Sequence, residues 1–143
     1  MDTRTTITDT ALVDAFNRAD WTAFVGTLTP DMTYEEPATG RAVQGAQAYA
    51  RLCMGWREAL PDVRGTVTRS LRQGDTLVQE VVWTGTHTGN LETPGGSIPP
   101  TGRRIEVMAV LWCDLEGDRI RFVRHHLDVM TMMTQIGVTS TPR

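Results

Sequence analysis

Apolar residues recur at helical spacing in three stretches of the first part of the chain. Leu12 and Phe16 share one helix face, and Asp20 stands where an N-cap would start the next helix. Pro61 ends the longest of these patterns, because proline does not continue a helix. The pattern predicts helices at residues 9–19, 21–28 and 44–60, with a short strand at 32–37.

After Pro61 the repeat of apolar residues falls to two, as in half-buried strands. The turn residues Gln73-Gly74-Asp75 and Glu116-Gly117-Asp118 separate successive strands of this part. The predicted strands are residues 63–71, 76–87, 104–115 and 119–128, followed by a helix at 129–136.

A long segment, residues 86–103, separates the second and third of these strands. It contains Pro94-Gly95-Gly96 and Pro99-Pro100, so we expect an irregular loop, of the kind that often forms a lid or a binding loop. Helices first and an antiparallel meander afterwards predict an α+β fold in which helices cover one face of a curved sheet.

The predicted strand 104–115 is apolar on both faces. Ile105, Val107 and Leu111 belong to one row, and Met108 and Trp112 to the other. A sheet with one face in water shows a cleaner alternation. We therefore expect the helices to cover the first row and a second subunit to cover part of the other, in a homodimer or a higher homo-oligomer.

Composition narrows the classes of partner. The 143 residues have average apolar and charged fractions and a net charge of −3, with no basic cluster, so a nucleic-acid partner is not expected. No run of about 20 apolar residues is present and the polar start does not resemble a signal peptide, so we expect a cytoplasmic protein without a membrane-spanning segment. The length fits a single domain, residues 1–143.

The cysteines and histidines do not indicate a metal site. Cys53 and Cys113 are far apart and outside any Cys-x-x-Cys pair, so both are expected to be buried thiols. His125 and His126 are adjacent in a strand and point to opposite faces, so they cannot bind one ion together. We expect neither a metal nor a cofactor.

The last predicted strand carries the strongest candidate for chemistry. Phe122, Arg124, His126 and Asp128 share one face, and we expect this face to border an apolar hollow beneath the helices. Burial would raise the pKa of the Asp128 carboxyl, and Arg124 would lower it. Asp128 also precedes a helix, so it could serve only as an N-cap.

Further candidates lie on other elements. Trp83 and His87 share a face of the second strand, with His87 at the mouth of the long loop, and Tyr34 shares a side with Glu36. A single strand histidine is more often structural, and the methionines of the last helix are more often core residues than ligand contacts.

With these residues in view, the chain resembles the SnoaL-like polyketide cyclases of the nuclear transport factor 2-like group. The stretches that carry the resemblance are WTGTHTG, PPTGRRIE and HHLDVMTMMTQIG, within a similarity that runs from about residue 8 to 137. The resemblance implies a cone-shaped α+β barrel with a curved antiparallel sheet wrapped around the N-terminal helices.

The resemblance also implies roles for particular residues. Asp128, ahead of Gln135-Ile136-Gly137, matches the family's general acid and base, and His87 matches a histidine that lines its pocket. The implied reaction is an intramolecular aldol condensation of an aromatic polyketide ester, without a cofactor. The expected contacts with a hydrophobic, polycyclic substrate are Tyr34, Trp56, Trp83, Glu106, Met108, Trp112, Phe122, Arg124 and His126.

Related scaffolds carry other functions, so alternatives stay open. An epoxide hydrolase would use an acid–arginine–acid set, for which Glu106, Arg124 and Asp128 are the candidates. An isomerase, an accessory hydroxylation protein and a ligand-binding module without catalysis are further alternatives.

Overall fold

The computed structural model describes residues 5–138 of the chain. Within this range the helices are α1 (Thr5–Arg18), α2 (Trp21–Gly26), α3 (Ala46–Ala59) and α4 (Val129–Gln135). The strands are β1 (Leu28–Glu36), β2 (Arg41–Gln44), β3 (Arg64–Gln73), β4 (Thr76–Thr86), β5 (Leu91–Thr93), β6 (Gly96–Ile98), β7 (Arg104–Glu116) and β8 (Arg119–Leu127).

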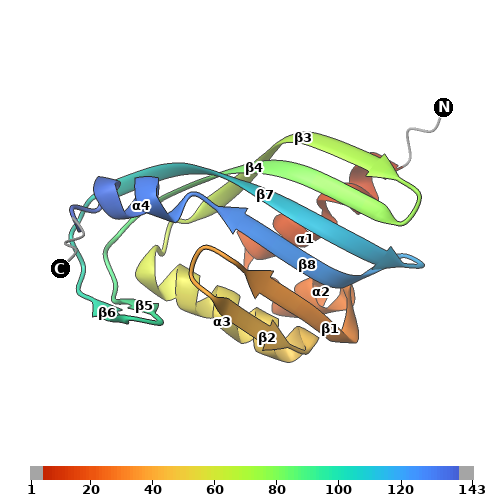
Figure 1. Ribbon diagram of the computed structural model, residues 1–143, viewed down its shortest axis with the longest axis horizontal. Helices are drawn as coiled ribbons and strands as arrows, with labels where there is room; N and C mark the ends of the chain where they lie inside the picture. Colours follow the sequence, from red (N-terminus) through yellow and green to blue (C-terminus); the bar gives the residue numbers. More distant parts are fainter. Residues whose placement is uncertain (1–4, 139–143) are drawn as a thin grey trace.

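Six strands form one curved sheet in the order β2-β1-β8-β7-β4-β3. All neighbours are antiparallel except β1 and β8, which run parallel. Helices α1, α2 and α3 lie behind this sheet in Figure 1 and cover its inner face. The α+β class and the curved, mainly antiparallel sheet were predicted correctly; the sheet stays open, with β2 and β3 as its edges.

The inner face and the helices share one hydrophobic core. Along β7 every second residue is buried, from Ile105 through Val107 to Leu115, and the intervening residues are exposed or half-buried. Residues from α1, α2 and α3 pack against this row, among them Phe16, Phe24 and Tyr49. The two apolar rows predicted for this strand are therefore present, and only one of them is covered.

Strand β8 contains a bulge that decides which of its side chains face the helices. Leu115 of β7 pairs with Ile120, but the next residue along β7, Asp114, pairs with Phe122. Arg121 is thus an extra residue in β8, opposite no residue of β7. A bulge of this kind reverses the inward and outward alternation of the strand beyond it.

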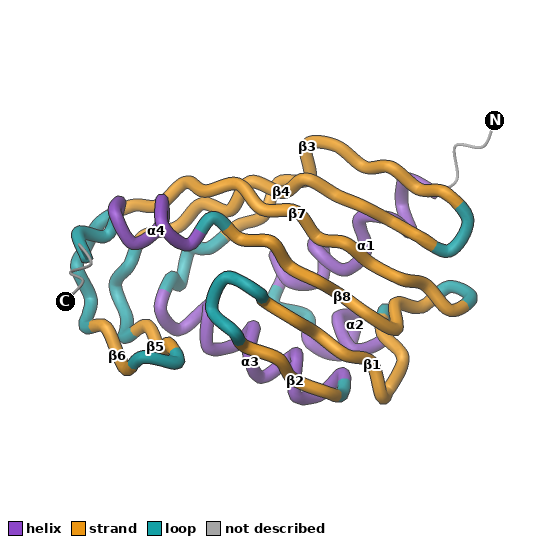
Figure 2. The backbone as a smooth tube through the Cα atoms, viewed as in Figure 1, coloured by secondary structure: helices purple, strands orange, loops and turns teal. Residues whose placement is uncertain are grey.

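Two parts of the fold differ from the sequence-based expectation. The chain turns after β1 and pairs back on it as the short strand β2, ahead of α3. The expected irregular loop contains the small hairpin β5–β6, in which Gly96 opens β6 with a φ of 129°. Figure 2 shows this hairpin beside the end of α3, where Leu91 is buried. Proline and glycine interrupt the segment but leave room for two three-residue strands.

No helix within residues 5–138 combines the length and the apolar character needed to span a membrane.

Candidate active site

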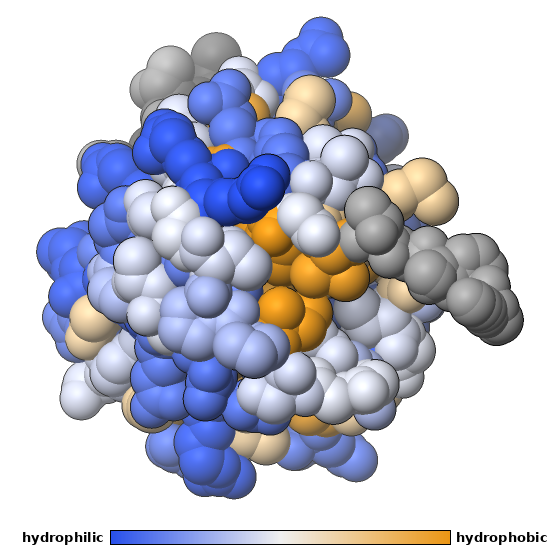
Figure 3. All heavy atoms as spheres, turned by 90° about the vertical axis from the view of Figure 1, so that its left-hand side faces the viewer, coloured by the Kyte–Doolittle hydropathy of each residue, from blue (hydrophilic) through white to orange (hydrophobic). Residues whose placement is uncertain are grey.

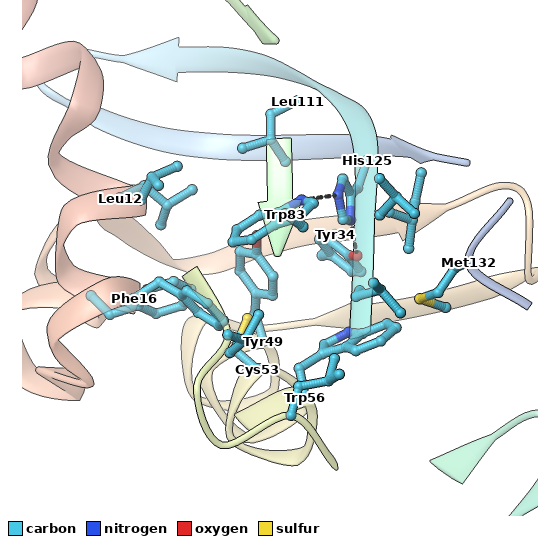
Figure 4. Close-up of a pocket in the computed structure, with 17 residues that line it drawn as sticks. Leu12, Phe16, Tyr34, Tyr49, Cys53, Trp56, Trp83, Leu111, His125 and Met132 are labelled. Atoms are coloured by element: carbon cyan, nitrogen blue, oxygen red, sulfur yellow. Dashed lines mark hydrogen bonds between the residues drawn. The ribbon is translucent and has the colours of Figure 1, made fainter. Parts of the chain in front are cut away.

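An apolar pocket lies between the inner face of the sheet and the helices. Figure 4 shows the side chains of the 17 residues that line it. They come from α1, α2, α3 and the turn after α3, from the strands β1, β4, β7 and β8, and from α4, and most are hydrocarbon or aromatic. The end of the molecule that carries α4 and the β5–β6 hairpin shows a hollow with an apolar floor and a more polar rim (Figure 3).

The pocket is narrow. Its cavity volume is ≈ 50 Å³, room for a few water molecules. A ligand with an aromatic ring must therefore displace lining side chains or lie partly in the opening. Met132, from the short helix α4, and Trp56, from α3, are lining residues on the right-hand side of Figure 4.

A chain of hydrogen bonds enters the pocket wall at His125. Its Nε2 lies 3.3 Å from the indole Nε1 of Trp83, and its Nδ1 lies 2.8 Å from the phenol oxygen of Tyr34. The Tyr34 hydroxyl donates to Glu36 Oε1 over 2.6 Å, and the Thr39 hydroxyl donates to Glu36 Oε2 over 2.8 Å. Figure 4 shows the two contacts of the His125 ring as dashed lines.

Three elements place these groups together. Parallel pairing of β1 with β8 sets Tyr34 opposite Val123, two residues from His125. Trp83 stands on the inner face of β4, in edge-to-face contact with Phe16 at a centroid distance of 5.1 Å. The Tyr34 ring stacks on Tyr49 of α3 at 4.4 Å. The polar atoms of the network are therefore held by aromatic packing on both sides.

Burial controls the protonation of the pocket. It lowers the pKa of His125 to about 4, although the nearby Glu36 acts in the opposite direction. Burial raises the pKa values of the Tyr34 phenol and the Cys53 thiol well above their ordinary values. At neutral pH the imidazole is therefore neutral, and the phenol and the thiol keep their protons. Among the described lining residues, His125 is the group able to accept a proton.

Gly65 makes room for Trp83. A β-carbon at Gly65 would lie 2.5 Å from the Trp83 ring, too close for both to stay in place. The Asn17 side chain binds the backbone of Gly65 at both its N–H and its carbonyl oxygen, each over 2.8 Å, and so joins α1 to β3 at this point. The absence of a side chain at Gly65 is thus a condition for the Trp83–His125 contact.

Helix α4 is attached to the sheet by Gln135. Its amide accepts from the Glu106 N–H over 2.8 Å and donates to the Glu106 carbonyl over 3.0 Å. The pairing of β7 with β8 begins only at Ala109, so the Gln135 amide bonds the strand where β8 has ended. Gly137 follows with a φ of 85°, next to the Arg103 side chain. The Gln-x-Gly ending thus fixes the helix that carries Met132 into the pocket lining.

The predicted substrate-contact residues fall into two groups. Tyr34, Trp56 and Trp83 line the pocket. The others predicted on strands β7 and β8 lie on the outer face of the sheet: Glu106, Met108, Trp112, Phe122, Arg124 and His126.

The expectation that Phe122, Arg124 and His126 face the helices is wrong. Regular alternation from the buried Ile120 would turn them inward, but the bulge at Arg121 turns them outward. Val123, His125 and Leu127 are buried in their place.

Arg124 lies far from the acids of the predicted hydrolase set. On the outer face it forms an ion pair with Glu35 at 3.2 Å and lies over the Phe122 ring. Asp128 bonds Thr131, and Glu106 is exposed on β7. The Glu106–Arg124–Asp128 set is therefore not assembled around a pocket.

Asp128 is exposed and caps helix α4. Its carboxylate accepts from the Thr131 N–H over 3.1 Å and from the Thr131 hydroxyl over 2.7 Å. These two bonds lower the pKa of the Asp128 carboxyl, opposite to the rise expected for a group in an apolar hollow. Asp128 is not among the residues that line the pocket. The predicted N-cap is confirmed, whereas the expected burial is wrong.

His87 is buried at the base of a loop, and it does not line the pocket. Its backbone pairs with Arg103 and Gly102, and its Nδ1 accepts from the Thr101 N–H over 3.3 Å. These contacts close the base of segment 88–102. Within the described part of the chain, His87 Nε2 is buried without a hydrogen-bond partner.

His125 was not among the predicted site residues, although its neighbour was. The alternation rule alone assigns it to the outer face, and its pairing with Leu111 of the buried row is the signal that reverses the assignment. That pairing depends on the bulge, which a single sequence does not specify.

Within residues 5–138, no three His, Cys, Asp or Glu side chains lie together in a group that could hold a metal ion. Cys53 and Cys113 are both free and buried, as predicted.

A family model described as SnoaL-like polyketide cyclase matches residues 6–136. No curated protein matches the chain significantly in sequence.

Several solved structures share the fold. IdmH from Streptomyces antibioticus, a proposed polyketide cyclase, is 26% identical, with a TM-score of 0.79 over 95% of this chain and 100% of its own. AclR from Streptomyces galilaeus, a proposed hydroxylase, is 20% identical, with a TM-score of 0.76 over 95% of this chain and 83% of its own. An epoxide hydrolase from M. tuberculosis is 16% identical, with a TM-score of 0.68 over 90% of this chain and 86% of its own.

Proposed function

Because the chain belongs to the SnoaL-like polyketide cyclase family, we propose that it closes a ring in a polyketide-derived substrate by a cofactor-free intramolecular aldol reaction. The observation that carries the proposal is the position of His125, a neutral imidazole in the wall of an apolar pocket. Such a pocket suits a hydrophobic small molecule, and its dry interior suits proton transfer to a fixed base.

The reaction uses one base and returns its proton. Nε2 of His125 takes a proton from a carbon between two carbonyl groups, and the electrons of that C–H bond form an enolate. The enolate carbon attacks a third carbonyl of the same molecule, forming a C–C bond. The resulting alkoxide then takes the proton from Nε2–H, so the enzyme ends unchanged. Holding the two reacting carbons together in a narrow pocket supplies much of the rate.

The Trp83 indole N–H is placed to share in this step. Its 3.3 Å bond to Nε2 is long for a nitrogen donor, so a substrate can replace it at small cost. The N–H would then donate to the enolate oxygen while Nε2 holds the proton. Tyr34 and Trp56 supply aromatic contact area in the same pocket.

Asp128 is the competing candidate for the base, since it matches the family's acid and base by position. The exposed carboxylate would have to reach a substrate held in the pocket opening rather than in the pocket. The two hypotheses differ in the substitution that stops turnover.

The test is a product analysis with an aryl β-keto ester that bears a third carbonyl, a ketone, in position for six-membered ring closure. We expect a ring-closed isomer of unchanged mass, and a loss of about 100-fold or more in kcat for His125→Gln. A full loss in Asp128→Asn with an active His125→Gln would overturn the choice of base. A product that gains one water would indicate a hydrolase, and one that gains an oxygen a hydroxylating protein; either would overturn the proposal.

We also propose that the outer face of the sheet forms a homodimer interface. Met108 and Trp112 are 54% and 44% exposed, and Val110 between them is half-buried. Leu71 and Val78 continue the apolar row beside Trp112, because Leu71 pairs with Val78 and Val78 with Trp112. Contiguous exposed apolar side chains on a sheet face favour association with a second copy.

A further inference from the structure

The hydrogen bonds behind His125 fix where its proton lies. An indole N–H can only donate, so Nε2, which receives it from Trp83, carries the lone pair. The proton of the neutral ring is then on Nδ1 and is donated to the Tyr34 oxygen. The Tyr34 hydroxyl must in turn donate to Glu36. Because each hydrogen bond can form in only one direction, the chain of groups has a single arrangement of protons.

Glu36 ends this chain inside the protein. Its side chain is 0% exposed, and both carboxylate oxygens accept from hydroxyl groups, one of Tyr34 and one of Thr39. This is the bonding pattern of an ionised carboxylate, which accepts at both oxygens. Burial of a carboxylate costs free energy. A fully buried carboxylate that bonds a phenol and lies 3.9 Å from an imidazole therefore points to a role in the site.

We propose that Glu36 acts through Tyr34 as the positioning residue and proton acceptor of His125. The inference rests on the proposed function, because it assumes that Nε2 receives a proton from the substrate. When Nε2 gains that proton, the Nδ1 proton passes to the Tyr34 oxygen and the Tyr34 proton passes to Glu36 Oε1. The imidazole and the phenol end neutral, Glu36 becomes a carboxylic acid, and the negative charge lies on the enolate.

The relay explains how the buried His125 ring can take up a proton. Burial disfavours the charged imidazolium, as the low pKa of His125 records. A relay that carries the positive charge away lets the ring take up a proton without staying charged. The titratable groups around the ring are Glu36 and Tyr34 on β1, Tyr49 and Cys53 on α3, and His126 on the same strand. Of these, Glu36 has a direct chain of hydrogen bonds to Nδ1.

The first test needs no substrate. In protein labelled with ¹⁵N-histidine, we expect the His125 signal at pH 7 to be that of the neutral tautomer with the proton on Nδ1. A ring protonated on Nε2 would overturn the relay, whether or not the protein is a cyclase. In Tyr34→Phe the Nδ1 proton loses its acceptor while the Trp83 N–H still donates to Nε2, so the proton should stay on Nδ1 and the Nδ1–H signal should shift to that of an N–H without this bond.

The second test is kinetic and uses the same β-keto ester. Glu36→Gln keeps the shape of the side chain but cannot take a proton as a carboxylate does, so kcat should fall by about 100-fold with little change in KM. Tyr34→Phe should give a similar loss, and the double variant should lose little more, because both break one relay. Glu35→Gln, one residue away on the outer face, is the matched control and should keep its activity.

The outcomes separate the two proposals. If His125→Gln lowers kcat and Glu36→Gln does not, the relay is wrong and the proposed function stands. If His125→Gln has no effect, His125 is not the base and the relay is wrong, whereas a wild-type protein that forms no ring-closed isomer contradicts the proposed function. In both cases the tautomer measurement still decides whether the hydrogen-bond chain is as described. Should Glu36→Gln not fold, Tyr34→Phe and the wild-type tautomer carry the test.

Discussion

His125 and His126 are neighbours in the chain and lie on opposite faces of the sheet. His125 is 7% exposed and its ring lines the pocket, while His126 is exposed on the outer face. The chemical difference between them is large, because only the buried ring loses its hydration and gains the bonds to Trp83 and Tyr34. Several measurements follow from the position of that one ring.

Stability should decrease in mild acid because of His125. Its pKa is about 4 in the folded protein and about 6.5 when unfolded, so between these values the unfolded chain binds the extra proton. The free energy of unfolding should therefore be about 2 kcal/mol lower at pH 5 than at pH 7 from this residue alone. Urea unfolding at both pH values should show a smaller decrease in His125→Gln, and an unchanged one in His126→Gln. Equal decreases in wild type and His125→Gln would contradict the assignment.

Replacement of Gly65 by alanine should disturb the pocket from outside. The new methyl group would meet the Trp83 ring at 2.5 Å, and the ring, backed by Phe16, would have to turn away. We expect a destabilisation of about 1–3 kcal/mol and a shift in tryptophan fluorescence. Gly26→Ala is the control, because a β-carbon there meets no atom within 4 Å. An unchanged emission spectrum in Gly65→Ala would show that the ring has room to spare.

Loss of the Gln135 amide should loosen helix α4. Gln135→Leu removes both bonds to the Glu106 backbone, which should cost about 1–2 kcal/mol. Amide hydrogen exchange in residues 129–136 should become faster, while exchange in β4 should not change. Protection of α4 equal to that in the wild type would show that Met132 and Ile136, both buried, hold the helix alone.

The proposed dimer can be tested on the outer face of the sheet. Trp112→Arg places a charge within the exposed apolar row and should convert a dimer to a monomer in light scattering at micromolar concentration. Thr22→Arg, exposed on α2, should leave the mass unchanged. A monomeric wild-type protein would remove the proposal.

Much of the architecture could be predicted from local patterns. The N-caps Asp20 and Asp128, the apolar row beginning at Ile105 and the turns at Gly74 and Gly117 each depend on interactions between near neighbours, and the structure contains all of them. The parallel pairing of β1 with β8 depends on contacts between distant segments, and periodicity does not report it.

The site was predicted less well than the fold because its residues depend on register. Tyr34, Trp56 and Trp83 lie in regular elements, and all three line the pocket. The expected face of β8 was wrong by one residue, because a bulge adds a residue to one strand without a mark in the sequence. The roles proposed for Asp128 and His87, and the cytoplasmic location, stay predictions.

The extra residue at Arg121 decides which histidine of β8 enters the pocket. If Arg121 were deleted, Ile120 would stay opposite Leu115 and Phe122 opposite Asp114, so the alternation would become regular up to the turn and His125 would stay in the pocket. If Arg121 were kept but β8 paired without a bulge, the far half would slide by one position, His126 would enter the pocket and His125 would meet solvent. The bulge alone thus selects which of two identical side chains has a buried ring.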